Sequence, residues 1–370
     1  MTAIDLTTLN RVLIIKLRHH GDVLLTSPLF TVLKNRAPHL EIDALVYEDT
    51  REMLSLHTAI THLFGLKRSN KQPHLLTQIQ EEWALFKQLH SRHYDLIIHL
   101  TEHSRGMWWA LALHSPHRLA YNHSQRKGRL WRYAFNHLAV LGSPRRHTVE
   151  KHLDVLRKIG ISPQESEKKL VLVPGDAATQ RISQLMSYHQ LTPRGFIHIH
   201  PASRWLFKCW PAEKMAQLIT QLQQQGETIV LTAAPDATEC AMIDNITARL
   251  DHKPIDLSGQ LSLKELAALT AQAKCFIGVD SAPMHIAAAM QTPVVTLFGP
   301  SGDLEWGPWR VDHRTVTLDY SCRPCGVDGC GGSKVSDCLV NIPVEKVKSA
   351  VGTLLQASAQ HTKSNLPFVD

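Results

Sequence analysis

The sequence of 370 residues contains no stretch of 18 consecutive apolar residues, so no transmembrane helix is expected. Its first ten residues, MTAIDLTTLN, lack a basic segment followed by a long apolar run. This argues against a secretory signal peptide and for a cytoplasmic protein. The seven cysteines are therefore expected to be free thiols or metal ligands rather than disulfides.

Several nucleotide- and metal-binding patterns are also missing. The chain has neither G-x-G-x-x-G nor G-x-x-x-x-G-K-[ST], which removes the main support for a dinucleotide-binding or P-loop protein. It has no D-x-D pair of carboxylates for a magnesium diphosphate, and its 23 histidines form no H-E-x-x-H. A site for a diphosphate would need cationic side chains and a helix N-terminus instead of a metal.

Acidic residues are scarce in the first half of the chain. Residues 1–170 carry 24 Lys and Arg against 15 Asp and Glu, a balance of +9, whereas the remaining residues carry 16 against 18, a balance of −2. The basic half is expected to face a partner that the other half does not. Nucleic acid, anionic lipid and a phosphorylated small molecule are all candidates.

The length and the pattern of apolar residues predict two α/β domains. Compact apolar runs such as RVLIIKL, GFIHIH and CFIGV are expected to be buried strands, and they alternate with amphipathic helical segments. Alternating strands and helices indicate parallel sheets with helices on both faces. We expect an N-terminal domain over 1–175, a second domain over 190–345 and a C-terminal helix within 346–370. Such folds bind ligands at the carboxyl ends of their strands.

The segment GVDSAPMH (278–285) is predicted to run from the end of a strand into a helix. Ser281 suits the N-cap and Pro283 the first helical turn. A helix N-terminus offers free N–H groups and a positive dipole to an anion, and His285 follows within about one turn. The segment is either a phosphate cradle or a plain turn capped by Asp280 and Ser281, and spacing alone favours the plain turn.

Two other junctions carry charged residues. Asp22 follows Gly21 at a strand-to-helix turn, where a carboxylate either caps the helix or acts as a general base. Lys208 lies among aromatic residues in HPASRWLFKCWP, where it is either solvated or held over a cleft, with Arg204 as a second cation.

Two clusters remain open from the residues alone. The stretch 117–137 mixes basic and aromatic residues, which suits single-stranded nucleic acid, a membrane headgroup zone, a phosphorylated sugar lipid or merely a solvated helix face. Cys322, Cys325, Cys330 and Cys338 could form a structural metal site, but their later spacings are irregular and unligated thiols are favoured.

Three segments occur in order: KLRHHGDVLLTSPLF, HPASRWLFKCWP and GVDSAPMHIAAAMQTPVVTLFGPS. Together they resemble the bacterial lipopolysaccharide heptosyltransferases of glycosyltransferase family 9. The RHHGD and FKCW motifs are most similar to the heptosyltransferase III branch. The resemblance runs through most of the chain.

This resemblance implies a GT-B architecture, with two Rossmann-like, doubly wound domains facing a central cleft and the C-terminal helix packing back toward the first domain. It implies an inverting transfer of L-glycero-D-manno-heptose from ADP-heptose to the heptose of the lipopolysaccharide inner core, with no cofactor and no essential metal. The implied partners are ADP-heptose and a core–lipid A acceptor at the cytoplasmic face of the inner membrane, with peripheral attachment and without nucleic acid.

The resemblance also implies roles for individual residues. Asp22 would be the base, and Lys208 would contact the donor phosphate. Asp236 or Glu239 would bind the adenosine ribose or adenine. The predicted donor or diphosphate site comprises Arg204, Asp280, Ser281, Ala282, Pro283, Met284 and His285. The candidates for acceptor phosphates are Arg18, Lys67, Arg68, Arg126, Lys127 and Arg129.

Three other functions remain alternatives. A related transferase would use a different nucleotide sugar, and competition by ADP against UDP would separate it from a heptosyltransferase. A nucleic-acid-binding protein would use the basic half and bind oligonucleotides with a steep salt dependence. A non-catalytic lipopolysaccharide-binding relative would have no use for intact Asp22 and Lys208.

Overall fold

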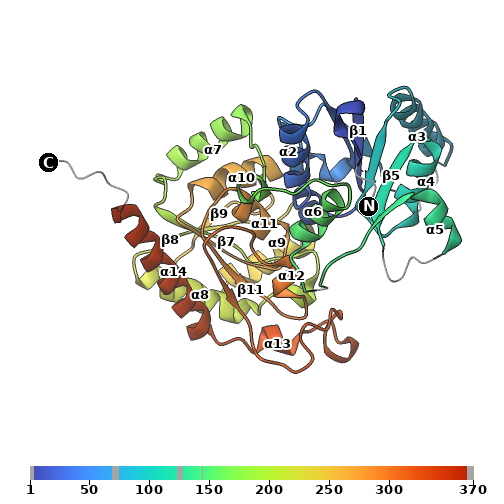
Figure 1. Cartoon of the computed structure of the whole chain (residues 1–370). Helices are drawn as coiled ribbons and strands as arrows, with labels where there is room; N and C mark the ends of the chain where they lie inside the picture. Colours follow the sequence, from blue (N-terminus) through green and yellow to red (C-terminus); the bar gives the residue numbers. More distant parts are fainter. Residues whose placement is uncertain (1–3, 69–74, 123–127, 144, 365–370) are drawn as a thin grey trace. The chain divides into compact units, whose positions relative to one another are not determined.

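A computed structural model describes residues 4–68, 75–122, 128–143 and 145–364 (Figure 1). The chain divides into two compact units, residues 1–173 and 174–370. Each unit contains one parallel sheet with the doubly wound order expected of a Rossmann-like domain. Residues 176–189, left between the two predicted domains, contain the helix α7 (Asp176–Tyr188), which packs within the second unit.

The first unit has a six-stranded sheet in the order β3-β2-β1-β4-β5-β6. Its central strands are apolar on both faces, because helices cover both sides of a parallel sheet. The strands are β1 (Arg11–Lys16), β2 (Glu41–Tyr47), β3 (His62–Leu66), β4 (Leu96–His99), β5 (His117–Tyr121) and β6 (His137–Ala139). The helices are α1 (His20–Leu24), α2 (Ser27–Arg36), α3 (Leu75–His90), α4 (Ser104–Ala112), α5 (Arg129–Ala134) and α6 (Thr148–Lys158).

The helix predicted after β1 is broken into α1 and α2. Leu25 and Thr26 separate the two helices, and the Thr26 hydroxyl donates to the Val23 carbonyl at 2.6 Å. Pro28 lies in the first turn of α2, where its missing N–H costs nothing. The break leaves α1 as a short helix that positions Asp22 directly after β1.

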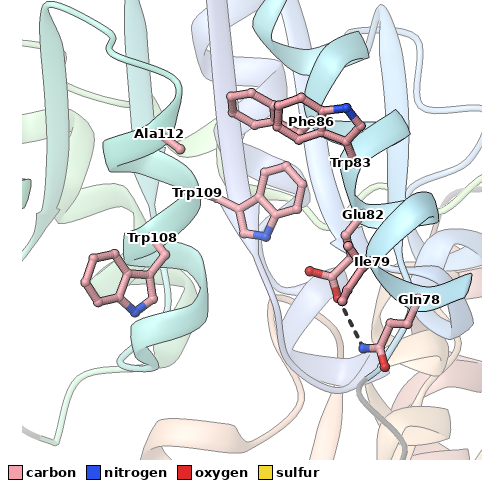
Figure 2. Close-up of a pocket in the computed structure, with 8 residues that line it drawn as sticks. All are labelled: Gln78, Ile79, Glu82, Trp83, Phe86, Trp108, Trp109 and Ala112. Carbon is pink, nitrogen blue, oxygen red and sulfur yellow. Dashed lines mark hydrogen bonds between the residues drawn. The ribbon is translucent and has the colours of Figure 1, made fainter. Parts of the chain in front are cut away.

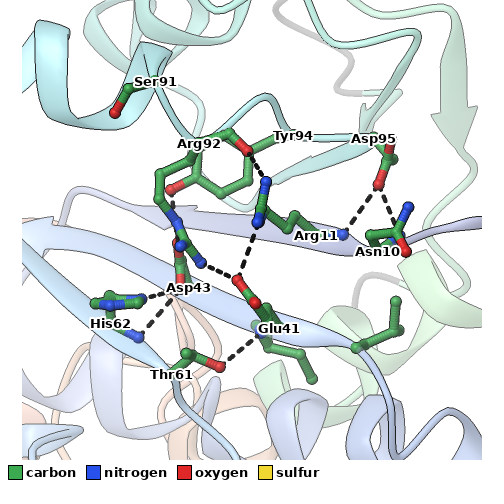
Figure 3. A network of polar contacts seen from close by, with 12 residues as sticks. Asn10, Arg11, Glu41, Asp43, Thr61, His62, Ser91, Arg92, Tyr94 and Asp95 are labelled. Atoms are coloured by element: carbon green, nitrogen blue, oxygen red, sulfur yellow. Dashed lines mark hydrogen bonds and ion pairs between the residues drawn. The ribbon is translucent and has the colours of Figure 1, made fainter.

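A network of ion pairs closes the amino edge of this sheet (Figure 3). Arg11 Nε lies 3.0 Å from Glu41 Oε2, and Arg92 contacts both Glu41 and Asp43. Tyr94 donates its hydroxyl to the fully buried Asp43 at 2.8 Å. Hydrogen bonds from the two arginines lower the pKa of Glu41. These groups thus pair with one another at the amino edge of the sheet.

The second unit repeats the plan in the order β12-β11-β10-β7-β8-β9. Its core joins the central strands to α8 and α14. The strands are β7 (Phe196–His200), β8 (Thr228–Leu231), β9 (Ile255–Asp256), β10 (Cys275–Val279), β11 (Val294–Leu297) and β12 (His313–Val316). The helices are α7 (Asp176–Tyr188), α8 (Ala212–Gln224), α9 (Ala237–Thr247), α10 (Leu263–Gln272), α11 (Ala282–Ala289), α12 (Asp303–Trp306), α13 (Asp337–Val340) and α14 (Val344–Ser364).

Local signals explain where these helices begin and end. Ser262 and Glu265 form the predicted capping box of α10. Pro211 precedes α8, and Gly226 follows it with φ of +85°, a conformation that favours glycine. The C-terminal helix α14 packs on α8, β11 and β12 of its own unit. Its packing toward the first domain stays a prediction.

Candidate active site

Asp22 lies in the first turn of α1, immediately beyond the carboxyl end of β1. Its side chain is mostly buried, and its Oδ1 lies 3.7 Å from both Lys16 Nζ and Arg18 Nε. Among the hydrogen bonds of the described residues, none runs from a helix N–H to this carboxylate. Asp22 is therefore not a helix cap. It is an ionisable group held between two cations at distances longer than a hydrogen bond.

Lys16 was not among the predicted site residues. It ends β1, and its ammonium group donates to the Leu100 carbonyl at 2.9 Å. Burial lowers the pKa of Lys16, and the charge of Asp22 opposes this effect. A lysine that ends the apolar run VLII, in the segment that leads to Gly21-Asp22, is the sequence signal that could have identified it, since lysine is almost never buried without a partner.

A second buried pair lies nearby at the same sheet edge. Tyr121, at the end of β5, is hydrogen-bonded to His152 Nδ1 on α6. Burial raises the pKa of Tyr121, and the charges of Glu102, Asp154 and Asp22 add to the effect. Burial likewise keeps the pKa of His152 well below its ordinary value. Both groups are therefore neutral near pH 7, and the charge of Asp22 is one of those that keep Tyr121 protonated.

Lys208 and Asp280 are brought together in the second unit. Lys208 ends a short 3-10 helix, Leu206–Lys208, and Asp280 follows β10. Lys208 Nζ donates to Asp280 Oδ2 at 2.6 Å, and the side chains are 23% and 10% exposed. The interpretation of Lys208 as a solvated lysine is therefore wrong. Asp280 is not a helix cap but the partner of this cation.

The start of α11 lies next to this pair. Ser281 occupies the N-cap position as predicted, but its hydroxyl makes no capping bond and instead donates to the Val279 carbonyl at 3.4 Å. Pro283 has no N–H, and the Met284 N–H is engaged by the Ser281 carbonyl at 3.2 Å. Ser281 and Ala282 therefore supply the backbone N–H groups that this helix start offers to an anion.

The side chains of the next two residues point into the core. Met284 is fully buried, and its sulfur accepts a hydrogen bond from the Thr296 hydroxyl at 3.2 Å. His285 is also buried. Roles in diphosphate binding for Pro283, Met284 and His285 remain predictions, and for Met284 such a role would have to involve the backbone.

The other donor-site candidates lie in the second unit. Arg204 is exposed, with its guanidinium 5.7 Å from the ring centre of Trp205. Asp236 caps α9 by accepting from the N–H groups of Thr238 and Glu239. Glu239 accepts from the Ala234 N–H at 3.0 Å and lies 3.7 Å from His200. Ribose or adenine binding by Asp236 or Glu239 stays a prediction.

Three of the acceptor-phosphate candidates lie close together in the first unit. Arg68 donates to the Arg18 carbonyl at 3.0 Å and pairs with Asp49 at 2.9 Å. Lys67 pairs with Glu81 at 2.6 Å. Arg129 is exposed at the start of α5, and Arg126 and Lys127 lie outside the described residues. Phosphate binding by these residues stays a prediction. Among the described candidates, Arg18 lies 3.7 Å from Asp22, and Arg68 contacts Arg18.

The four clustered cysteines are only partly buried. Cys322, Cys325 and Cys330 are exposed, and Cys338 is buried. Burial raises the pKa of Cys338, with the other three cysteines contributing smaller effects. Within the described ranges, no three His, Cys, Asp or Glu side chains are arranged to hold a metal ion. A metal at this cluster stays an untested alternative.

Two Rossmann-like units, each with charged groups at the carboxyl edge of its sheet, define the architecture of the GT-B glycosyltransferases. The family model described as "Glycosyltransferase family 9 (heptosyltransferase)" matches residues 82–335. Lipopolysaccharide heptosyltransferase 3 of Escherichia coli strain K12 is 36% identical over 298 residues, which cover 79% of this chain and 83% of that protein. The chain belongs to glycosyltransferase family 9, the heptosyltransferases.

Solved structures agree on the fold. A family 9 glycosyltransferase from Veillonella parvula superposes with a TM-score of 0.81 at 23% identity, covering 96% of this chain and 99% of that one. Escherichia coli heptosyltransferase WaaC, solved with ADP, gives a TM-score of 0.71 at 20% identity and covers 93% and 99%. In the part of the chain that the structure describes, no helix is long and apolar enough to cross a membrane.

Proposed function

We propose that this chain is a heptosyltransferase of the heptosyltransferase III type, which moves L-glycero-D-manno-heptose from ADP-heptose to the heptose of the lipopolysaccharide inner core with inversion. The observation that carries the proposal is the Lys208–Asp280 pair beside the open start of α11. The identity to lipopolysaccharide heptosyltransferase 3 and the ADP bound by the structurally similar WaaC support this donor.

The second unit supplies the charges that a departing diphosphate requires. Lys208 is held in place by Asp280 but remains partly exposed, so its ammonium group can donate to a phosphate oxygen as well. The N–H groups of Ser281 and Ala282 and the dipole of α11 add fixed donors. Groups arranged in advance around a developing negative charge are the largest source of rate acceleration in most such sites.

The first unit supplies the proposed base. As the acceptor hydroxyl attacks the anomeric carbon, the new carbon–oxygen bond forms while the bond to the ADP oxygen breaks. The hydroxyl proton passes to the carboxylate of Asp22, and ADP leaves with the electron pair. Attack opposite the leaving group inverts the anomeric centre. Lys16 and Arg18 hold the carboxylate without a short hydrogen bond, which leaves its oxygens available to accept this proton.

The basic first unit is proposed to receive the phosphates of the core–lipid A acceptor at the cytoplasmic face of the inner membrane, where the protein is attached peripherally. Among the described candidates, Arg18 lies 3.7 Å from Asp22, and Arg68 contacts the Arg18 carbonyl. No cofactor and no essential metal take part in this proposal, because cations and helix N–H groups provide the countercharge.

The test is a transfer assay with ADP-heptose, UDP-glucose and UDP-heptose as donors and heptose-containing core oligosaccharide as acceptor. We expect turnover with ADP-heptose alone, resistance to EDTA, inhibition by ADP and a product whose anomeric configuration by NMR is opposite to that of the donor. Turnover with a UDP-sugar, loss of activity in EDTA or retention of configuration would contradict the corresponding part of the proposal.

A further inference from the structure

An aromatic groove lies between α3 and α4 of the first unit (Figure 2). Ile79, Trp83 and Phe86 line it from α3, and Trp108 and Trp109 line it from α4. The hollow has a volume of about 590 Å³. Trp109 points toward α3 in Figure 2 and is almost buried, whereas Trp83 and Trp108 are 56% and 55% exposed. We call this feature the aromatic groove.

The helix that follows the groove, α5, also carries exposed apolar side chains. This helix packs against α4 at the same end of the first unit (Figure 1). Its Trp131 and Ala134 enter the core, while Leu130 and Tyr133 are exposed, Tyr133 to 74%. Exposed tryptophans, a tyrosine and aliphatic residues on three neighbouring helices mark a surface that another phase or molecule covers.

The rim of this surface is basic. Lys87 lies 5.6 Å from the ring centre of Trp83, and Arg129 and Arg132 are exposed beside Leu130 and Tyr133. Among the ion pairs of the described residues, none engages these three cations. The acidic residues of α3 are neutralised, since Glu81 pairs with Lys67 and Glu82 with Arg105. The surface therefore presents apolar rings framed by positive charge.

We propose that α3, α4 and α5 together form the surface by which this protein docks onto a bilayer that contains anionic phospholipid. The inference rests on the proposed function, in which the acceptor is anchored to a membrane. Trp and Tyr side chains favour the boundary between headgroups and acyl chains, and Lys and Arg beside them are attracted to anionic headgroups. The aromatic groove would take the upper part of an acyl chain.

The charges distinguish a bilayer from a second copy of the chain. A symmetric dimer would bring the same patch of both copies together, so Lys87, Arg129 and Arg132 of each copy would face like charges. Such juxtaposition is unfavourable. A bilayer with negative headgroups instead complements the rim while its acyl region covers the rings.

The experiment is co-sedimentation of the full chain with vesicles of phosphatidylglycerol and phosphatidylethanolamine, compared with vesicles of phosphatidylcholine alone. We expect binding to the anionic vesicles that weakens with salt. The variant Trp83→Ser/Trp108→Ser should reduce the partition coefficient by more than about tenfold, and Trp83→Phe/Trp108→Phe should restore much of it. Lys87→Gln and Arg132→Gln should each cost about fivefold.

A matched control comes from α7 of the second unit. Arg181 and Tyr188 are exposed there, Tyr188 to 81%, and Arg181→Gln/Tyr188→Ser should bind vesicles as the unmodified chain does. Circular dichroism and the melting temperature establish that each variant is folded. Equal losses in the control variant, or no binding of the unmodified chain to anionic vesicles, would overturn the proposal.

Two further measurements separate this proposal from its alternatives. Sedimentation equilibrium would show a dimer that Trp83→Ser/Trp108→Ser dissociates if the patch joined two copies, and this result without vesicle binding overturns the proposal. Turnover on a deacylated, water-soluble acceptor should be unchanged in the same variant. A folded chain that binds anionic vesicles through the patch but transfers no heptose to that acceptor contradicts the proposed function and leaves the docking surface intact.

Discussion

Each unit places a lysine beside an aspartate at the carboxyl edge of its sheet, but the two pairs differ in geometry. In the first unit Lys16 and Asp22 are 3.7 Å apart, and the lysine side chain is only 6% exposed. In the second unit Lys208 and Asp280 are 2.6 Å apart, and the lysine is 23% exposed. The same two residue types thus form a loose, buried pair and a short, accessible one.

The difference indicates which partner of each pair is available for chemistry. Lys16 is committed to the Leu100 carbonyl, so the carboxylate of Asp22 is the group that can accept a new hydrogen bond. Lys208 is oriented by Asp280 but still reaches solvent, so the cation is the group that can take a new partner. The first pair therefore suits a base, and the second suits an anion clamp.

The largest effect is expected for Asp22→Asn. The amide cannot accept the acceptor's proton, and loss of a general base lowers turnover by about a thousandfold. ADP affinity, measured by isothermal titration calorimetry, should be unchanged, because the proposed donor contacts lie in the second unit. The control is Asp251→Asn at an exposed turn, which should retain full turnover. An Asp22→Asn enzyme within threefold of the unmodified rate would remove Asp22 from the mechanism.

A smaller loss is expected for Lys208→Met. Removing a cation that binds a phosphate should weaken ADP binding and reduce kcat/KM for ADP-heptose by about a hundredfold. The same substitution leaves the buried Asp280 carboxylate without its partner, which should lower the free energy of unfolding by about 1–2 kcal/mol.

The double variant Lys208→Met/Asp280→Asn separates the two effects. It should recover most of the lost stability in urea unfolding without recovering kcat/KM, because the unpaired charge is gone but the phosphate contact is not restored. Recovery of kcat/KM would mean that Lys208 acts only by neutralising Asp280.

The sequence predicts the centre of each sheet better than its edges. Strands β1, β4, β7 and β10 are short apolar runs because both of their faces are covered. The missed strands are β3 (HLFGL), β5 (HRLAY), β6 (HLA), β9 (ID) and β12 (HRTV). All but β5 are edge strands, where one neighbour is lacking and polar residues are tolerated, and β5 lies next to an edge strand. Pairing with a neighbouring strand, rather than local pattern, makes these segments extended.

At the two sites, too, the sequence indicates single residues but not the contacts between distant segments. The sequence singles out Asp22, Lys208 and Asp280 individually, because each lies at a strand-to-helix junction. It could not pair Lys208 with Asp280 across 72 positions, or show that the Ser281 hydroxyl leaves the helix start uncapped. Lys16 was missed because the run RVLIIK is read as a buried strand, and the role of its last residue depends on the neighbouring strand β4 and on the position of α1.

Two helical glycines should respond to alanine with opposite sign. A Cβ at Gly106 of α4 would lie 2.2 Å from His99 Nε2, and Trp131 and Phe135 pack on that imidazole. Gly106→Ala should therefore lower the free energy of unfolding by about 1–2 kcal/mol. Nothing lies within 4 Å of a Cβ at Gly352 in α14, so Gly352→Ala should raise stability by about 0.5–1 kcal/mol. Urea unfolding measures both, and a loss for Gly352→Ala would contradict this account.

His99 of the first unit and His198 of the second unit are both fully buried. Burial lowers the pKa of His99 and of His198 to about 3, from an ordinary value of 6.5. The unfolded chain therefore binds a proton below pH 6.5 that the folded chain takes up only near pH 3. Stability is full above pH 6.5 and falls as the pH drops toward 3, by about 1 kcal/mol per histidine at pH 5.5.

Substituting leucine should remove this acid-dependent loss at either position but differ in effect at pH 7.5. Neither ring nitrogen of His99 has a hydrogen-bond partner among the described residues, so His99→Leu should leave stability unchanged or higher. His198 bonds the hydroxyls of Thr232 at 2.7 Å and Thr270 at 3.1 Å, and His198→Leu should cost about 1–3 kcal/mol through the partners left behind. Urea unfolding at pH 7.5 and at pH 5.5 measures both the change in stability at neutral pH and the acid-dependent loss. The loss of stability at low pH depends on burial, whereas the loss expected at pH 7.5 depends on hydrogen bonds. If the two leucine variants had the same free energy of unfolding at pH 7.5, the hydrogen bonds of His198 would not stabilise the second unit.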